Sequence, residues 1–354
     1  QVLQLEAVAC KDWLTNKVDR CVGGKVAKQQ TAGEIQLPLN NVGVVSLDYT
    51  GKEGVATAIG HSPVASLIDP VAGSRTAIAE SLSNIIWAPL KDGLKSVSLS
   101  ANWMWASKNE GEAARLYEAV DACSNFAIEL GINIPTGKDS LSMKQNYPDV
   151  EVISPGTVII SAAGQCSDVT KVIEPVLRRN GGNIYHINLS CDNYKLGGSS
   201  FSQVLNAVGN EVPTIKDAAS FKNSFDVIQE LIKAGKITSG HDIGSGGLIT
   251  TLLEMSFPSL NLGAEYDLTE LRESDTIKVL FAENISIVIQ ADDSVEADLA
   301  KNNVAFTKIG KPKEGSVITL KNGTDYLYFE IPEVRDTWFK TSYLLDREQS
   351  GIKK

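Results

Sequence analysis

The sequence predicts a mixed α+β protein with two domains. Runs rich in β-branched residues, such as 42–47 and 184–189, are interspersed with stretches whose apolar residues recur at helical spacing, such as 69–86 and 110–130. The 354 residues are also enough for two domains and a sizeable core. A charged stretch with Pro and paired Gly, 168–182, lies between the two series of elements, so we place the domain boundary there.

Further strands and helices are expected along the chain, which we divide into five segments. Further strands are predicted at 97–101, 156–164, 285–289 and 304–310, and further helices at 12–19, 196–207, 217–234 and from 333 onwards. The last helix carries Trp338 and Tyr343, so it needs a partner that covers its aromatic side chains. We expect a lead-in at 1–34, an N-terminal domain at 35–167, a linker at 168–182, a C-terminal domain at 183–332 and a tail at 333–354.

The composition excludes several classes of protein. A hydrophobic content of 43% and a charged content of 21% are ordinary for a soluble globular protein, and no apolar run approaches the ~18 residues that span a membrane. The net charge of −10 argues against general binding to nucleic acid or to anionic membranes but leaves room for a local basic pocket. The first residues lack the blocks of a secretory signal, so we expect a cytoplasmic protein. Because an initial Met is missing, we expect a chain that is processed or cut from a longer one.

The cysteines do not suggest a metal or disulfide framework. They are odd in number, widely spaced, and include no Cys-x-x-Cys pair and no Cys/His cluster. We expect buried, inert thiols in a reducing cytosol rather than a zinc site or a nucleophile. The residues concerned are Cys10, Cys21, Cys123, Cys166 and Cys191.

The candidate site is a glycine-rich stretch, Gly240–Leu248, that opens an apolar run ready to form a helix. Its four glycines let backbone amides approach a ligand closely. Amides at a helix start bind anions, because they lack partners and the helix dipole is positive there. Asp242 is placed to hold a metal ion that partners the anion. The alternative is a glycine-rich turn that caps a helix.

Two carbonyl-bearing side chains share a face of the helix at 69–86. Asp69 is its expected N-cap and Pro70 its first residue. Glu80 and Asn84 are four residues apart, so they are able to coordinate Mg²⁺ together. The alternative is an ordinary solvated face.

A polar loop is expected at 135–143. Lys138, with hydroxyl groups beside it, is a candidate phosphate contact, although its spacing differs from that of a P-loop. The alternative is a loop that joins two parts of the domain by polar bonds. The three histidines, His61, His186 and His241, are expected to be structural.

Six short motifs occur in order along the chain, and together they resemble one family. They are Leu67-Ile68-Asp69-Pro70, Ala79-Glu80-Ser81-Leu82-Ser83-Asn84, Asn102-Trp103-Met104-Trp105, Gly137-Lys138-Asp139-Ser140-Leu141-Ser142-Met143, Leu196-Gly197-Gly198 and Gly240-His241-Asp242. From about Cys21 to the tail, the chain resembles the large, single-chain phosphoribosylformylglycinamidine synthases of purine biosynthesis. It is similar to the second of their two aminoimidazole-ribonucleotide-synthetase-like units, without the first unit, which carries the family's catalytic His, and without the glutaminase.

The resemblance implies the two-domain fold of that synthetase-like superfamily and a role in a ligase. The family converts formylglycinamide ribonucleotide (FGAR) to the amidine, using ATP and glutamine-derived ammonia. The implied partners are the first synthetase-like half and the glutaminase of the same polypeptide, with ATP and FGAR as ligands. The segment is expected to hold no catalytic residue and to be inactive alone. The absent first half leaves a surface on which the isolated segment can homodimerise.

The resemblance also implies an auxiliary Mg²⁺–nucleotide site for ATP or ADP. The implied metal ligands are Asn41, Glu80, Asn84 and Asp242, the nucleotide contacts are Asn40 and Gly244, and the substrate or phosphate contacts are Lys138, Asp139 and Ser140.

Three positions depart from the family pattern. Asn41 stands where the family usually has Asp, Gly244 replaces a hydroxyl residue, and Ser245 replaces an acid. We therefore hypothesise that this site binds nucleotide poorly or has lost it. The alternative function is a structural scaffold that binds no ligand, supports the catalytic half and docks the glutaminase. A free-standing relative, such as a selenophosphate-synthetase-like enzyme, is disfavoured by the tryptophan motif.

Overall fold

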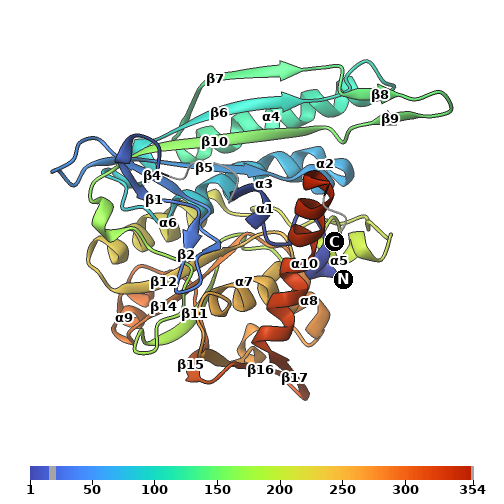
Figure 1. Cartoon of the computed structure of the whole chain (residues 1–354). Coiled ribbons are helices and arrows are strands. Elements are labelled where there is room, and N and C mark those ends of the chain that lie inside the picture. The colour runs from blue at the N-terminus through green and yellow to red at the C-terminus, as the bar shows by residue number, and fades with distance from the viewer. Residues whose placement is uncertain (16–20, 352–354) are drawn as a thin grey trace.

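The chain folds around two β-sheets that lie one above the other (Figure 1). The structure is a computed structural model and describes residues 1–15 and 21–351. The first sheet has the strand order β1-β4-β5-β10-β6-β7, and only β6 and β7 pair in parallel. Its strands are β1 (Val26–Lys28), β4 (Gly43–Ser46), β5 (Gly54–His61), β6 (Val97–Met104), β7 (Asn133–Ser140) and β10 (Thr157–Cys166). Helices α2 (Pro63–Ile68), α3 (Pro70–Ile85) and α4 (Glu112–Leu130) accompany it.

The second sheet has the order β12-β14-β11-β15-β13-β16-β17, and only β13 and β16 pair in parallel. Its strands are β11 (Asn183–Asn188), β12 (Ile237–Ile243), β13 (Leu262–Asp267), β14 (Ser286–Ala291), β15 (Thr307–Glu314), β16 (Val317–Asn322) and β17 (Asp325–Glu330). Its helices are α5 (Ser200–Val204), α6 (Ala218–Lys233), α7 (Gly247–Ser256), α8 (Thr276–Phe281), α9 (Ser294–Lys301) and α10 (Ile331–Ser350). The smaller elements are α1 (Asp12–Thr15), the pair β2 (Thr31–Ala32) and β3 (Leu37–Pro38), and the hairpin β8 (Lys144–Asn146) and β9 (Glu151–Ile153).

One hydrophobic core joins the two sheets. Phe126 on α4 meets Phe221 on α6 edge to face, with ring centroids 6.2 Å apart. Gln229 on α6 is fully buried: its side-chain oxygen accepts from Leu90 N at 2.7 Å, and its amide nitrogen donates to the carbonyl oxygens of Ile86 and Ala88. A buried amide with every bond satisfied fixes the contact more tightly than apolar packing alone.

The lead-in residues 1–15 pack on α10. The indole nitrogen of Trp338 donates to Val8 O at 2.9 Å, and the side chain is only 1% exposed. The Thr341 hydroxyl donates to Gln4 O, and Trp13 N donates to the Ser342 hydroxyl, both at 2.8 Å. We call residues 6–11 the strap. The partner required by the last helix is thus the lead-in, although Tyr343 stays exposed.

The predicted fold class is confirmed, as are the signals that start and end the main helices. Asp69 caps α3 by accepting from Val71 N and Ala72 N at 2.9 and 3.0 Å. Helix α4 ends where Gly131 adopts a φ of 73°. The predicted helix at 12–19 is present as α1, and residues 16–20 lie outside the described ranges.

Several local predictions were wrong. The expected polar loop at 135–143 is largely strand β7, and the first half of the glycine stretch is the end of β12. The helix expected at 196–207 is reduced to α5. Strand β5 was missed because its buried face consists of Gly and Ala, which lack a strong strand signal. The small side chains are required there: a Cβ on Gly60 would lie 2.3 Å from Ala77 O of α3.

No helix among the described residues has the length and apolar character needed to cross a membrane.

Candidate functional site

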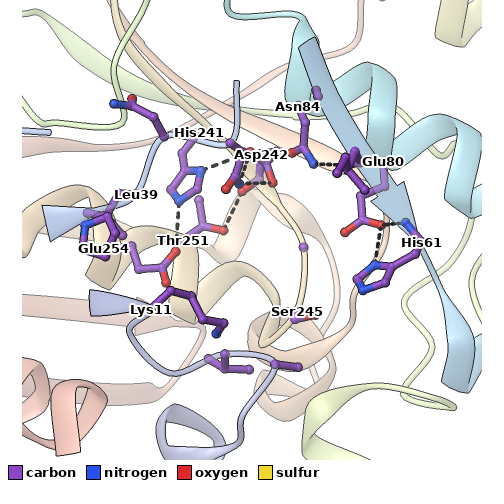
Figure 2. Close-up of a pocket in the computed structure, with 18 of the residues that line it drawn as sticks. Lys11, Leu39, His61, Glu80, Asn84, His241, Asp242, Ser245, Thr251 and Glu254 are labelled. Carbon is purple, nitrogen blue, oxygen red and sulfur yellow. Dashed lines mark hydrogen bonds and ion pairs between the residues drawn. The ribbon is translucent and has the colours of Figure 1, made fainter. Parts of the chain in front are cut away.

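A cavity of about 760 Å³ lies between the two sheets, beneath the strap (Figure 2). Its walls come from the strap, from residues 38–41, from β5, β10 and α3 of the first sheet, and from β12 and α7 of the second. The implied metal ligands and nucleotide contacts all line it, although they are far apart in sequence: Asn40, Asn41, Glu80, Asn84, Asp242 and Gly244. By contrast, Lys138, Asp139 and Ser140 lie outside this cavity, on the outermost strand β7, with Lys138 and Asp139 exposed.

Asp242 is the best-held acid of the cavity. It lies near the end of β12 and is buried. Asn41 donates its amide group to both carboxylate oxygens, at 2.9 and 3.1 Å, and His241 Nδ1 lies 3.2 Å from one of them. Burial alone would raise the pKa of Asp242, but the charge of His241 and these hydrogen bonds outweigh it, so the pKa lies below its usual value.

His241 bridges two acids. Its Nε2 lies 2.9 Å from Glu254 Oε2 on α7. Burial by itself would lower the pKa of His241, but the charges of Asp242 and Glu254 raise it well above its usual value. The ring is therefore a buried imidazolium that orients Asp242. This role agrees with the structural assignment expected from the sequence, but the partner Glu254 was not foreseen.

Glu80 and Asn84 present oxygens from α3. Asn84 Nδ2 donates to Ile59 O at 2.8 Å, which leaves its buried Oδ1 with no hydrogen-bond partner. That oxygen is turned toward Asp242 (Figure 2). Glu80 Oε2 accepts a hydrogen bond from the backbone N–H of His61 at 2.6 Å. A second interaction, between the Glu80 carboxylate and the His61 ring, raises the pKa of His61.

Gly244 shows how close these oxygens lie. A Cβ placed on it would be 3.6 Å from Asp242 Oδ2 and 3.9 Å from Glu80 Oε1. Oxygens of Asp242 and Glu80 thus both lie beside Gly244, Asn84 lines the same cavity, and hard oxygen donors of this kind suit Mg²⁺. In the described ranges, no three His, Cys, Asp or Glu side chains form a metal-binding group. The remaining ligands of a metal would therefore be water or phosphate oxygens. Asn41 points its N–H at Asp242, and its role as a metal ligand stays a prediction.

The helix start behind the glycine stretch is already occupied by a carboxyl group of the chain. Gly246 N, at the N-cap of α7, donates to Glu283 Oε1 at 2.7 Å. The same oxygen accepts from Ser200 N at 2.8 Å. The hydrogen-bond acceptor at these amides is therefore supplied by the chain itself, and the sequence carried no local signal for Glu283.

The strap adds a cation that the sequence did not reveal. The Lys11 ammonium group donates to Glu6 O at 2.6 Å and Ala9 O at 2.5 Å, and Lys11 lines the cavity. Burial lowers its pKa, opposed by the charges of Glu6 and Glu254. Its place in the site depends on how the strap folds back, which no spacing in the sequence indicates.

Comparisons with known proteins agree on one family. Residues 10–165 match the FGAR-AT PurM_N-like domain, and residues 183–321 match the C-terminal domain of AIR synthase related proteins. A probable phosphoribosylformylglycinamidine synthase of Arabidopsis thaliana is 40% identical over 99% of this chain and 25% of its own length. The human phosphoribosylformylglycinamidine synthase is 38% identical over 99% of this chain and 27% of its own length.

A solved structure supports the fold independently. PurL from Thermotoga maritima, complexed with FGAR, superposes with a TM-score of 0.66 over 84% of this chain and 48% of that one, at 16% identity. The chain spans about a quarter of the length of the curated relatives it matches. The chain thus joins an FGAR-AT PurM_N-like domain to an AIR-synthase-related C-terminal domain, and over nearly its whole length it is similar to one segment of the phosphoribosylformylglycinamidine synthases.

Proposed function

We propose that this segment is a working part of an FGAR amidotransferase and supplies its auxiliary Mg²⁺–nucleotide pocket. The complete enzyme would convert FGAR to the amidine with ATP and glutamine. The observation that carries the proposal is the meeting of Glu80, Asn84 and Asp242 oxygens in one cavity of about 760 Å³. That volume lies within the ~300–1,000 Å³ typical of small-molecule sites.

The residues divide the work of holding Mg-ADP or Mg-ATP. Glu80, Asn84 and Asp242 hold the metal, which neutralises phosphate charge. Lys11 adds positive charge from the strap. Asn40 donates its amide N–H groups to Gln29 O and Thr31 O, so its buried and unpartnered Oδ1 is left to accept a hydrogen bond from the ligand.

The pocket binds less tightly than one with the usual family residues. Asn41 contributes no charge to the metal, and Gly244 offers no hydroxyl to a phosphate. One missing hydrogen bond is worth roughly 0.5–1.5 kcal/mol, which corresponds to a loss of about twofold to tenfold in affinity. The absence of a hydroxyl at Gly244 should therefore lower the affinity for the nucleotide without abolishing binding.

Calorimetry with Mg-ADP tests the proposal. The purified chain should bind one equivalent in the presence of Mg²⁺ and much less in EDTA. Glu80→Gln and Asp242→Asn should each weaken binding, whereas Glu118→Gln, which alters an exposed acid on α4, should not. If Mg-ADP binds neither to the unsubstituted segment nor to the complete enzyme, the alternative of a scaffold that binds no ligand would be favoured.

We infer that catalysis requires the rest of the same polypeptide. The first synthetase-like half, the glutaminase and FGAR are the partners proposed for this segment, with the cytoplasm as its compartment. Lys138, Asp139 and Ser140 are proposed to contact phosphate or substrate across the shared interface, because β7 lies at the open edge of the first sheet. Activity should be absent in the segment alone and return when the other parts are added; failure with folded parts would contradict the assignment.

The open face of the first sheet is the proposed contact with the first half. It exposes Val45, Val55 and Ile59, the last with 57% of its surface accessible. Without that half, two copies of the segment should pair through this face. Sedimentation should detect a dimer that Ile59→Lys dissociates. The division into domains at 168–182 is likewise proposed, and limited proteolysis there would test it.

A further inference from the structure

We propose that Glu283 is a positioning residue of the pocket: its carboxyl group occupies the helix start and holds the turn Gly244–Gly247 in the shape that lines the cavity. The proposal rests on the function proposed above. It assigns a role to a side chain that touches neither the proposed metal nor the proposed nucleotide directly.

The geometry is that of one acceptor shared by two helix starts. Glu283 Oε1 accepts from Gly246 N at 2.7 Å and from Ser200 N at 2.8 Å. Gly246 caps α7, and Ser200 is the first residue of α5. The carboxylate therefore ties the Leu196-Gly197-Gly198 motif to the Gly240-His241-Asp242 motif, which are distant in sequence.

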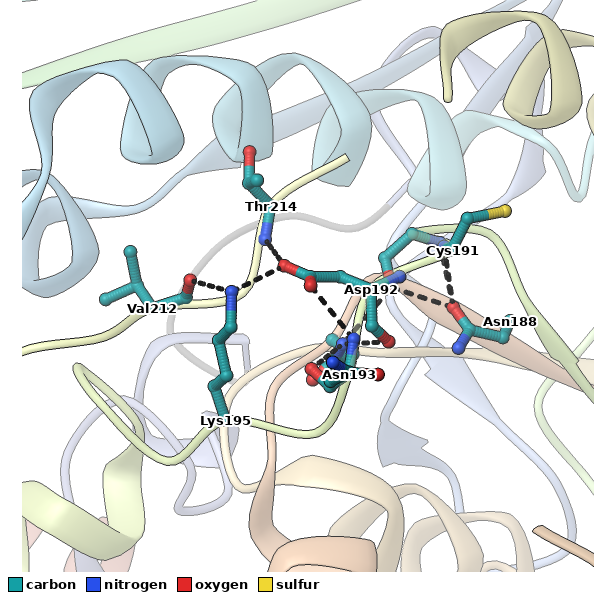
Figure 3. A network of polar contacts seen from close by, with 9 residues as sticks. Asn188, Cys191, Asp192, Asn193, Lys195, Val212 and Thr214 are labelled. Atoms are coloured by element: carbon teal, nitrogen blue, oxygen red, sulfur yellow. Dashed lines mark hydrogen bonds and ion pairs between the residues drawn. The ribbon is translucent and has the colours of Figure 1, made fainter. Parts of the chain in front are cut away.

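The element on the α5 side is itself fixed. Figure 3 shows the loop that precedes α5, in which the Asp192 carboxylate accepts from Lys195 Nζ at 2.9 Å and from Thr214 N at 3.1 Å. Asn188 Oδ1 accepts from Ser190 N and Cys191 N in the same loop. Glu283 thus anchors the glycine turn to a segment that is held by its own hydrogen bonds.

The glycine turn needs such an anchor. Gly246 and Gly247 adopt φ values of 91° and 72°, and Gly247 N donates to Gly244 O at 3.1 Å. Glycine has no side chain to hold this shape and loses much conformational freedom when it is ordered. Packing cannot be added at Gly246, because a Cβ there would lie 2.2 Å from the Thr250 hydroxyl. Hydrogen bonds must therefore do the ordering.

The position of the turn matters for the ligand. Gly244 and Ser245 line both the main cavity and an adjoining pocket of about 220 Å³ that also contains Glu283 and Glu80. Burial raises the pKa of Glu283 and nearby Glu80 acts in the same direction, whereas the two amide hydrogen bonds oppose them.

The test replaces the carboxylate and then restores it from solution. In Glu283→Ala, the Kd for Mg-ADP should rise by about tenfold or more, since two hydrogen bonds that order the turn are lost. Millimolar sodium formate should bring the Kd back toward the parent value, because formate presents the same carboxylate to the same amides. Sodium chloride at equal ionic strength should not, and formate should change neither the parent nor the exposed-acid control Glu270→Ala. Glu283→Gln, which keeps an oxygen acceptor without the charge, should fall between parent and Glu283→Ala.

Two binding results overturn the proposal: a Kd that is unchanged in Glu283→Ala, or a weaker binding that formate does not repair in a variant with the parent's circular dichroism. If the parent itself binds no Mg-ADP, the proposed function fails, yet Glu283 is still tested in the ligand-free chain. Amide exchange at Gly246 and Ser200 should speed up in Glu283→Ala and slow again with formate. Exchange rates that respond neither to the substitution nor to formate would contradict the role of Glu283.

Discussion

Asn41→Asp is the most informative single change in the pocket. Asn41 now donates to both oxygens of Asp242, at 2.9 and 3.1 Å. The substitution removes that donor and places a second carboxylate against the first. In the absence of metal, the hydrogen bond to a charged acceptor is lost, at about 1.5–3 kcal/mol. Two unit charges ~3 Å apart repel by about 5 kcal/mol at an effective dielectric constant of ~20, although sharing a proton relieves much of this.

We therefore expect Asn41→Asp to lower the free energy of unfolding by about 2–4 kcal/mol in EDTA at neutral pH. Mg²⁺ should offset most of this loss, because the two carboxylates would both be able to hold the cation, and at ~100 times its Kd the ion would return about 2.7 kcal/mol. Urea unfolding with EDTA or with Mg²⁺ measures both values. The exposed control Asn146→Asp should show neither effect.

The pH dependence gives a second signature. The repulsion raises the pKa of the acid pair in the folded state, so the penalty in EDTA should shrink as the pH falls and one carboxyl group takes up a proton. An Asn41→Asp chain as stable as the parent in EDTA, or one that Mg²⁺ does not restore, would refute the reasoning about this pair.

Three further predictions concern the frame of the site. Trp338→Ala should lower the free energy of unfolding by roughly 3–5 kcal/mol in urea, because it empties a buried position and frees the strap; Tyr343→Ala, on the exposed side of α10, should cost far less. Gln229→Leu should cost about 2–4 kcal/mol by leaving buried backbone groups without partners, and a loss below about 1 kcal/mol would contradict that account. The raised pKa of His241 means that its stabilisation is complete below its unfolded value of ~6.5 and declines as the pH rises toward the folded value. The stability difference between parent and His241→Gln should therefore narrow from pH 6 to pH 9, and a constant difference would show that the charge of His241 is not involved.

Local signals in the sequence were sufficient for the parts of the fold that local chemistry decides. The Asp69 cap, the Gly131 end of α4 and the shared face of Glu80 and Asn84 depend on a few neighbouring residues. The family motifs then brought Asn41 and Asp242 into the same site, which periodicity alone does not do.

The missed features depend on contacts between distant segments. Strand β5 lacks a strong strand signal because its buried face consists of Gly and Ala. Their small size is required by the close packing of α3, which the sequence alone does not show. Lys11 reaches the cavity because the strap folds back, and Glu283 reaches two helix starts from another part of the chain. The glycine stretch was also divided between a strand and a helix, because pairing of β12 with β14 overrides the weak strand preference of Gly240.

The strap and helix α10 both form part of the cavity wall, and they are joined to each other. Ala7, Val8 and Ala9 form part of its wall, Trp338 lines it as well, and Val8 is bonded to that Trp. A ligand that binds only when the strap is packed on α10 therefore stabilises that packing. Because the coupling is reciprocal, any change that stabilises the packing of α10 raises the affinity for the ligand by the same factor. The affinity of the pocket for its proposed ligand should therefore depend in part on how firmly α10 packs on the strap.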